Sequence, residues 1–457
     1  MRKTDLLVIG GSAAGIVCAT TARKAYGDIE ITVIRATEKV MVPCGIPYIY
    51  GTLYDTNKNL IPDKSLIDAN INLIIDEVIK IDKKDKTVIT KSNEVINYKK
   101  LILATGSVPI IPEFIPGHDL DNVFPAFKNQ EYLNMVLERV KTADNVTVIG
   151  GGFIGVEFAE QIHMAGKEVT LIEMADACLW QAFDKYYTDN LEAALNADGM
   201  NVMTGTKVKR IIGEKAVEAI ELEDGQRIPS DLVILGLGAK PNGKLAKDAG
   251  IEVNSKGAII VDQYTRTNDP DIFAVGDCAE KKCFFTGKDV PIMLASTAAM
   301  EAYIAGCNVF QLRLVRANKG TVSTFATKVL GKTYAATGLT EARAKQEGFT
   351  IMVGEFSTMD HHPGSLPGAQ KIDIKLIFSK CSGIILGAQV SGGDTVVEII
   401  NILSLAIQKG ITATELVTLQ RATHPLVTAS PIAYPINTAA LNAIAGNCKY
   451  LNEGLIV

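Results

Sequence analysis

The chain has 457 residues, 47% of them hydrophobic, which is enough to bury roughly three domains of about 150 residues each. The formal net charge is −5 and no basic block occurs, so we expect neither a nucleic-acid nor an anionic-membrane surface. No apolar run reaches the roughly eighteen residues of a membrane span, and the eight cysteines are scattered, which is typical of a reduced cytoplasmic protein.

The first elements predict a βαβ unit. Ser12 stands where a G-x-G-x-x-G turn has its second glycine, and Arg35 stands where the next strand usually ends in an acid. Taken alone, this turn fits a dinucleotide site and an ordinary strand–helix turn about equally well. The strand, turn, helix and second strand are predicted at Leu6–Ile9, Gly10–Gly15, Ile16–Tyr26 and Glu30–Ile34.

A single cysteine follows this unit, within Val42-Pro43-Cys44-Gly45-Ile46-Pro47-Tyr48. Gly45 and Pro47 predict a helix that starts just after Cys44, because proline is tolerated in the first helical turn. The positive end of that helix would favour the thiolate of Cys44. A buried structural cysteine is the alternative. The glycine-rich turns that flank Cys44 in the sequence favour a redox role instead.

The βαβ pattern then repeats. A buried strand at Leu101–Ala104 ends in Thr105-Gly106, and the proline-rich stretch Val108–Phe124 is typical of a linker. The second strand, turn, helix and strand are predicted at Val146–Ile149, Gly150–Gly155, Val156–Ala165 and Glu168–Glu173, and a strand at Leu232–Leu237 with the loop at 238–242 closes the unit.

The second turn is a complete G-x-G-x-x-G motif, Gly150-Gly151-Gly152-Phe153-Ile154-Gly155. Its glycines allow a pyrophosphate to approach the N–H groups of the following helix. Glu173 ends the next strand, where a carboxylate accepts hydrogen bonds from a ribose 2′-OH and repels a 2′-phosphate. The motif therefore predicts an NAD(H) site that prefers NADH to NADPH.

A later strand, Ile272–Val275, leads into Gly276-Asp277 and is expected to return to the first unit, which makes the second unit an insertion. An aspartate at such a strand end can bind a polyol such as ribitol, although an ordinary turn aspartate is the alternative. Cys278 and Cys283 have C-x4-C spacing but follow this turn, so we do not expect them to form a redox pair.

After about residue 320 the pattern changes to a separate α+β domain. Strands are predicted at Ile372–Phe378 and Ile384–Val390, and a helix at Val396–Gln408. His361-His362 has no third ligand nearby, so we expect a loop there and no metal site.

Over nearly its whole length the chain resembles the pyridine nucleotide–disulfide oxidoreductases. The matching motifs are Ala104-Thr105-Gly106, the second glycine turn and Ala274-Val275-Gly276-Asp277. Pro43–Tyr48 resembles the single-cysteine branch, which includes coenzyme A-disulfide reductases, NADH oxidases, NADH peroxidases and polysulfide or persulfide reductases. The resemblance implies one FAD and one NAD(H) per subunit, and a homodimer.

The fold implied is α/β, with two Rossmann-like FAD- and NAD(P)-binding domains plus a C-terminal α+β dimerisation domain. We expect the FAD-binding domain at residues 1–118 and 245–320, the NAD-binding domain at 119–244 and the dimerisation domain at 321–457.

The resemblance implies an enzyme that passes electrons from NADH through FAD to Cys44 and reduces a small disulfide, persulfide or polysulfide. An NADH oxidase that reduces O2 is the alternative, and a non-catalytic flavoprotein is a third possibility. Ala13 stands where oxidases and peroxidases of the branch usually have a histidine. The segment 365–368, Ser-Leu-Pro-Gly, lacks the tyrosine usual in coenzyme A-disulfide reductases. The electron acceptor therefore stays open.

Three catalytic residues are expected: Cys44, His424 and Tyr434. His424-Pro425 resembles the His-Pro of two-cysteine reductases, whose histidine serves the partner subunit as an acid, but Ala429 replaces the accompanying glutamate. A near-neutral imidazole suits protonation of a leaving thiolate, and a surface or interface histidine is the alternative. Tyr434 lies where relatives reach the flavin site of the other subunit.

By resemblance, the cofactor-binding residues come from the two glycine turns, the strand ends that face them and a few neighbouring positions, and Glu157 matches a glutamate near flavin and nicotinamide. They are Gly10, Ser12, Ala13, Gly15, Arg35, Pro43, Val78, Ala104, Thr105, Gly106, Gly150, Gly152, Ile154, Gly155, Glu157, Glu173, Gly238, Gly276, Asp277 and Ala295.

Overall fold

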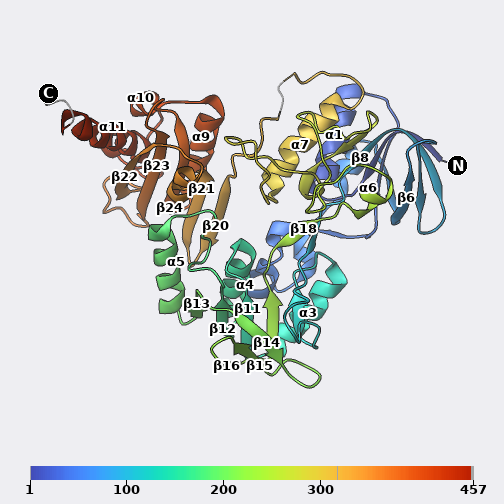
Figure 1. Ribbon diagram of the computed structural model, residues 1–457, viewed down its shortest axis with the longest axis horizontal. Helices are drawn as coiled ribbons and strands as arrows, with labels where there is room; N and C mark the ends of the chain where they lie inside the picture. The colour runs from blue at the N-terminus through green and yellow to red at the C-terminus, as the bar shows by residue number, and fades with distance from the viewer. Residues whose placement is uncertain (1, 316–317, 454–457) are drawn as a thin grey trace.

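The computed structural model describes residues 2–315 and 318–453. Figure 1 shows three groups of elements: an N-terminal group in blue with yellow α7, a central group in green and a C-terminal group in brown and red. Within the described residues, no helix is long and apolar enough to cross a membrane.

The N-terminal group is built on a seven-stranded sheet of order β5-β2-β1-β8-β7-β6, with β19 paired to β8. The strands are β1 (Arg2–Ile9), β2 (Ile31–Arg35), β5 (Asn72–Ile75), β6 (Val78–Asp82), β7 (Thr87–Thr90), β8 (Val95–Leu103) and β19 (Ile272–Ala274). Because β19 lies parallel to β8, the chain leaves this sheet and returns to it, which confirms the predicted insertion.

Two helices cover one face of this sheet side by side, α1 (Ala13–Tyr26) and α7 (Ala295–Asn308). Leu6, Leu7 and Val8 of β1 are fully buried, as expected for a parallel strand covered on both faces.

The central group contains a parallel five-stranded sheet of order β10-β17-β11-β12-β13. Its strands are β10 (Val123–Pro125), β11 (Asn145–Ile149), β12 (Glu168–Ile172), β13 (Asn201–Met203) and β17 (Leu232–Leu235), and its helices α3 (Gln130–Thr142), α4 (Phe153–Met164) and α5 (Lys185–Ala197). An antiparallel sheet of β14 (Val208–Ile212), β15 (Ala219–Leu222) and β16 (Arg227–Pro229) lies beside it. The pair β9 (Ser107–Pro109) and β18 (Ala239–Pro241) lies where the chain passes between the two groups.

The C-terminal group is an antiparallel sheet of order β20-β21-β24-β23-β22 with helices packed on it. The elements are β20 (Phe325–Val329), β21 (Lys332–Gly338), β22 (Ile351–Met359), β23 (Lys371–Ser379), β24 (Ile385–Gly392), α9 (Val396–Lys409), α10 (Ala413–Val417) and α11 (Pro435–Glu453). The predicted strands and helix of this region are confirmed, with ends shifted by one or two residues.

Candidate redox site

The first glycine turn forms a cradle in which side chains cannot fit. Gly10 has φ +117°, and a Cβ there would lie 2.1 Å from the carbonyl oxygen of Ala104. A Cβ on Gly15 would lie 1.9 Å from the oxygen of Gly10. Ser12 caps α1 without a side-chain hydrogen bond, so it leaves the first N–H groups of the helix to a ligand. This geometry fits a pyrophosphate.

The return strand brings an acidic side chain to the same place. Gly276 approaches α1 so closely that a Cβ would lie 3.0 Å from Cβ of Ala14. Ser107 donates a 2.8 Å hydrogen bond to Oδ2 of Asp277, and Nζ of Lys128 lies 3.0 Å from the Ser107 hydroxyl. The structure therefore brings residues 104–107, the first glycine turn and Asp277 together. The turn can hold a pyrophosphate and the Asp277 carboxylate can accept hydrogen bonds from a polyol, so this arrangement fits FAD.

Arg35 is held inside the protein. Its guanidinium forms a bidentate pair with Asp63, at 2.5 and 2.9 Å, and Nε donates to the carbonyl of Thr37. A further N–H donates to the carbonyl of Glu38. Its alkyl chain packs under Gly11, because a Cβ there would lie 2.6 Å from Cδ of Arg35. Arg35 thus supports the turn from below, with most of its donors already used.

The second glycine turn has the same construction. Gly150 has φ +112°, and a Cβ on Gly155 would lie 1.8 Å from the oxygen of Gly150. Gly152, in contrast, faces open space. The Glu173 carboxylate accepts hydrogen bonds from the N–H groups of Gly151 (2.6 Å) and Ala175 (2.7 Å), so it is held at the edge of the turn. These residues fit an NAD(H) with a free 2′-hydroxyl.

The surroundings of Cys44 differ from the prediction. Pro43–Gly45 form one 3₁₀ turn, and a short π turn, Ile49–Leu53, follows it. The N–H groups of Ile46, Ile49 and Tyr50 bond to carbonyls three residues back, as in a 3₁₀ turn, rather than four residues back as in an α-helix. The predicted helix is reduced to these two short turns, and the thiolate state of Cys44 stays a prediction.

The electrostatics of the Cys44 sulfur come from distant segments. Burial of the sulfur raises the pKa of the thiol above its usual value, and the Glu157 carboxylate raises it further. The Lys128 ammonium lowers this pKa, whereas Asp277 raises it. The residue is nevertheless exposed at the protein surface, so a small substrate can reach it.

We expect alkylation of Cys44 by iodoacetamide in the apoprotein to increase with pH along a curve whose midpoint lies above that of a free cysteine. The raised pKa means that the thiolate forms only at higher pH. Mass spectrometry of the Cys44 peptide measures the rate, and Lys128→Met should move the midpoint higher still. A midpoint below that of free cysteine would contradict this result and restore the helix-dipole interpretation.

Glu157 lies on α4, and its side chain bonds to the C-terminal group. Its Oε1 accepts a 2.8 Å hydrogen bond from Thr327 of β20. Burial raises the pKa of Glu157 to about 7, to which Glu160 contributes while the Thr327 bond opposes it. On the same helix, Gln161 accepts a 2.7 Å hydrogen bond from Thr52 of the π turn. Helix α4 begins at the second glycine turn. It therefore links that turn to the segment after Cys44, through Thr52, and to strand β20, through Thr327.

His424 and Tyr434 lie in the C-terminal group. His424 is exposed, and its Nδ1 accepts a hydrogen bond from the Leu426 N–H (3.3 Å), so a neutral imidazole carries its proton on Nε2. Tyr434 is buried with the Arg421 guanidinium 4.5 Å from its ring centre, and burial raises its pKa. In the described part of the protomer, neither side chain hydrogen-bonds to the residues around Cys44.

The remaining predicted residues border these turns or lie near them. Pro43 is half-buried beside Cys44, Ile154 is 39% exposed in the first turn of α4, and Ala295 begins α7. Val78 begins β6 at the edge of the first sheet and is half-buried, and Gly238, with φ +83°, faces open space before β18.

Sequence reasoning missed Ser107, Lys128 and Thr327. Ser107 directly follows the Ala-Thr-Gly motif, which could have suggested it. Lys128 and Thr327 belong to other groups of elements and have no local signal. Within the described ranges, no cluster of three potential metal ligands occurs.

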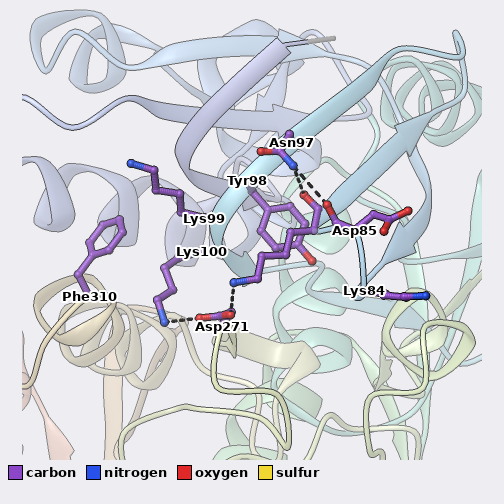
Figure 2. A pocket seen from close by; sticks show the side chains of 9 residues that line it. Lys84, Asp85, Asn97, Tyr98, Lys99, Lys100, Asp271 and Phe310 are labelled. Atoms are coloured by element: carbon purple, nitrogen blue, oxygen red, sulfur yellow. Dashed lines mark hydrogen bonds and ion pairs between the residues drawn. The ribbon is translucent and has the colours of Figure 1, made fainter.

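A surface cleft of about 570 Å³ lies away from this site, against the first sheet (Figure 2). Three of its four lysines are paired: Lys100 lies 2.5 Å from Oδ1 of Asp271, Lys86 binds the other oxygen of Asp271, and Lys99 lies 2.6 Å from Asp5. The cleft contains neither a nucleotide turn nor a cysteine, so we do not assign redox chemistry to it.

Comparisons with known proteins agree with this geometry. A family model described as pyridine nucleotide-disulphide oxidoreductase matches residues 4–302, and that of its dimerisation domain matches 324–432. A Methanocaldococcus jannaschii protein named NADH oxidase is 32% identical over 451 residues, covering 96% of this chain and 98% of that protein. A Pyrococcus horikoshii protein named NAD(P)H coenzyme A polysulfide/persulfide reductase is 33% identical over 402 residues, covering 86% and 88%. The solved structure of an NAD-dependent persulfide reductase from A. fulgidus matches with a TM-score of 0.89 and 32% identity, covering 98% of this chain and 84% of that one.

Proposed function

Because the chain belongs to the pyridine nucleotide-disulphide oxidoreductase family, we propose that it is an FAD-dependent, NADH-oxidising enzyme that reduces a small disulfide, persulfide or polysulfide at Cys44. The observation that carries this proposal is the pair of glycine cradles, one beside Asp277 and the other beside Glu173, in a chain that also exposes the Cys44 thiol. FAD, when bound, supplies two-electron transfer between NADH and the cysteine sulfur.

In this proposal Cys44 acts as the nucleophile. Its thiolate attacks a sulfur of R–S–S–R, which forms a Cys44–S–S–R mixed disulfide and releases RS⁻. Two electrons that originate from NADH then cleave the mixed disulfide to the Cys44 thiolate and a second RS⁻, and each RS⁻ takes up one proton. Lys128 stabilises the thiolate of Cys44. Glu157, whose pKa burial raises to about 7, is able to hold a proton near neutral pH.

NADH oxidase activity towards O2 is the second candidate, favoured by the relative of that name, which matches almost end to end. Ala13 argues against it, because a histidine is expected there in oxidases. Steady-state NADH consumption with O2, H2O2, coenzyme A disulfide and polysulfide separates the two. Faster turnover with the sulfur compounds than with O2 supports the reductase, and the reverse order would overturn it.

We expect Glu173→Gln to reduce the preference for NADH over NADPH by about 10–100-fold in kcat/KM, or about 1.4–2.8 kcal/mol. Glutamine keeps an acceptor for the Gly151 N–H but removes the charge that repels a 2′-phosphate. The ratio of kcat/KM for the two cofactors measures the effect. An unchanged ratio would show that Glu173 does not lie at the ribose.

We also propose a homodimer in which His424 or Tyr434 acts on the partner subunit. The dimerisation-domain match supports it, and so do three exposed apolar side chains beside these residues, Leu426 (54%), Val427 (53%) and Ile432 (94%). The domain boundaries expected from the sequence are kept in this proposal. We also propose a cytoplasmic location, because all seven cysteines whose surroundings the structure describes are free.

His424→Ala should slow turnover of disulfides with high-pKa thiols by about 100-fold, and that of polysulfide much less, because a poor leaving thiolate depends most on a proton donor. Tyr434→Phe tests the alternative donor in the same assay. An equal loss on every substrate would argue against a proton-donor role for either residue. A monomer in light scattering would remove the premise.

A further inference from the structure

A buried ion pair lies directly behind Gly276-Asp277. Nζ of Lys281 is 3.0 Å from Oε2 of Glu301, and their side chains are only 5% and 3% exposed. Lys281 follows the return strand β19, and Glu301 belongs to α7. The proposed reaction uses neither residue.

The pair holds both backbone groups of Gly276. Oε2 of Glu301 accepts the Gly276 N–H at 2.9 Å. Nζ of Lys281 donates to the carbonyl of Gly276 at 2.6 Å and to that of Ala279 at 2.8 Å. With Glu301, these acceptors use all three ammonium N–H bonds. Gly276, with φ +76°, is thus fixed on both sides of its Cα in a conformation that few other residues adopt.

The orientation of Asp277 follows from this arrangement. Asp277 is the next residue, and its carboxylate already accepts the Ser107 hydroxyl at 2.8 Å. Stability alone does not account for the pair, because desolvating two charges is costly and an apolar pair of similar volume is often equally stable. The Lys281 ammonium and the Glu301 carboxylate instead fix the backbone of Gly276, which fixes the direction in which the Asp277 carboxylate points.

We propose that Lys281 and Glu301 are positioning residues for FAD, which hold Gly276 so that Asp277 faces the polyol chain of the cofactor. The proposal rests on the proposed function, since FAD is its cofactor.

The test is a titration of apoprotein with FAD, followed by flavin fluorescence. A parallel titration uses ADP, which lacks both the flavin and the polyol and is therefore followed by calorimetry. Lys281→Met should weaken FAD binding by about 10–100-fold, because it leaves Glu301 buried without a cation and the Gly276 carbonyl without a donor. ADP binding should change by less than about threefold. The double variant Lys281→Met/Glu301→Gln should recover part of the FAD affinity, because it buries no unpaired charge.

Lys375→Met is the matched control. Lys375 is a buried lysine in the C-terminal group, 2.6 Å from Glu341, with its side chain 10% exposed. This variant should lower Tm without changing FAD affinity. Wild-type affinity for FAD in Lys281→Met, or an equal loss for FAD and ADP, would overturn the proposal. If Lys281→Met does not fold, Glu301→Gln alone undergoes the same comparison. Failure of the wild-type apoprotein to bind FAD would overturn the proposed function instead.

Discussion

Replacement of Cys44 by serine is expected to lower the reduction of disulfides and polysulfides by at least about 10³-fold. FAD content and anaerobic bleaching of the flavin by NADH should stay unchanged. Serine has nearly the shape of cysteine, and Cys44 is exposed on a short turn, so the fold should not respond. A serine hydroxyl cannot form the mixed disulfide on which turnover depends.

The matched control is Cys381→Ser, because Cys381 is also exposed and free but lies in the C-terminal group, in the turn between β23 and β24. It should keep the wild-type rate on every substrate. Stopped-flow absorbance separates the two half-reactions, NADH oxidation by the enzyme and reoxidation by the sulfur substrate. A Cys44→Ser enzyme that still reduces polysulfide at the parent rate would show that Cys44 is structural.

The sequence predicted the parts of the fold whose cause is local. The apolar strand at Leu6–Ile9 and the glycines at 10, 15, 150 and 155 imply strand–turn–helix units, because only glycine fits where a Cβ would strike the backbone. The family and the fold class follow from these motifs and are confirmed.

The surroundings of the sulfur could not be predicted in this way. Burial has the largest effect on the pKa of Cys44, followed by the charges of Glu157, Lys128 and Asp277, which come from three separate segments. Glu157 in turn accepts a hydrogen bond from Thr327, which lies 170 residues away in the sequence. Sequence spacing identified the thiol but could not identify the groups around it, because tertiary packing alone brings them together.

Arg35 is a second example. At the end of β2 the sequence shows only that the usual acid is missing. The structure shows why an arginine is tolerated there: Asp63, 28 residues further on, pairs with both of its terminal nitrogens. The partner lies in a short loop without a recognisable motif, so no pattern pointed to it.

Gly152→Ala should weaken NADH binding by about 2–3 kcal/mol, or roughly 30–150-fold in Kd, while Tm and FAD content stay at wild-type values. Gly152 has φ −72° and ψ 179°, which alanine adopts without strain, and a methyl group there meets no protein atom within 4 Å. The methyl group would occupy the space in front of α4 that a pyrophosphate needs in order to reach the helix N–H groups. Titration of the protein with NADH under anaerobic conditions measures the loss.

Gly446→Ala is the matched control for this variant, because Gly446 in α11 is a glycine without positive φ whose added Cβ would also meet nothing within 4 Å. It should leave both NADH affinity and FAD content unchanged. NADPH affinity should fall together with NADH affinity in Gly152→Ala, since the pyrophosphate is common to both cofactors, whereas Glu173→Gln changes their ratio. Wild-type NADH affinity in Gly152→Ala would place the nicotinamide cofactor somewhere other than the second glycine turn, because the same methyl group cannot share that space with a pyrophosphate.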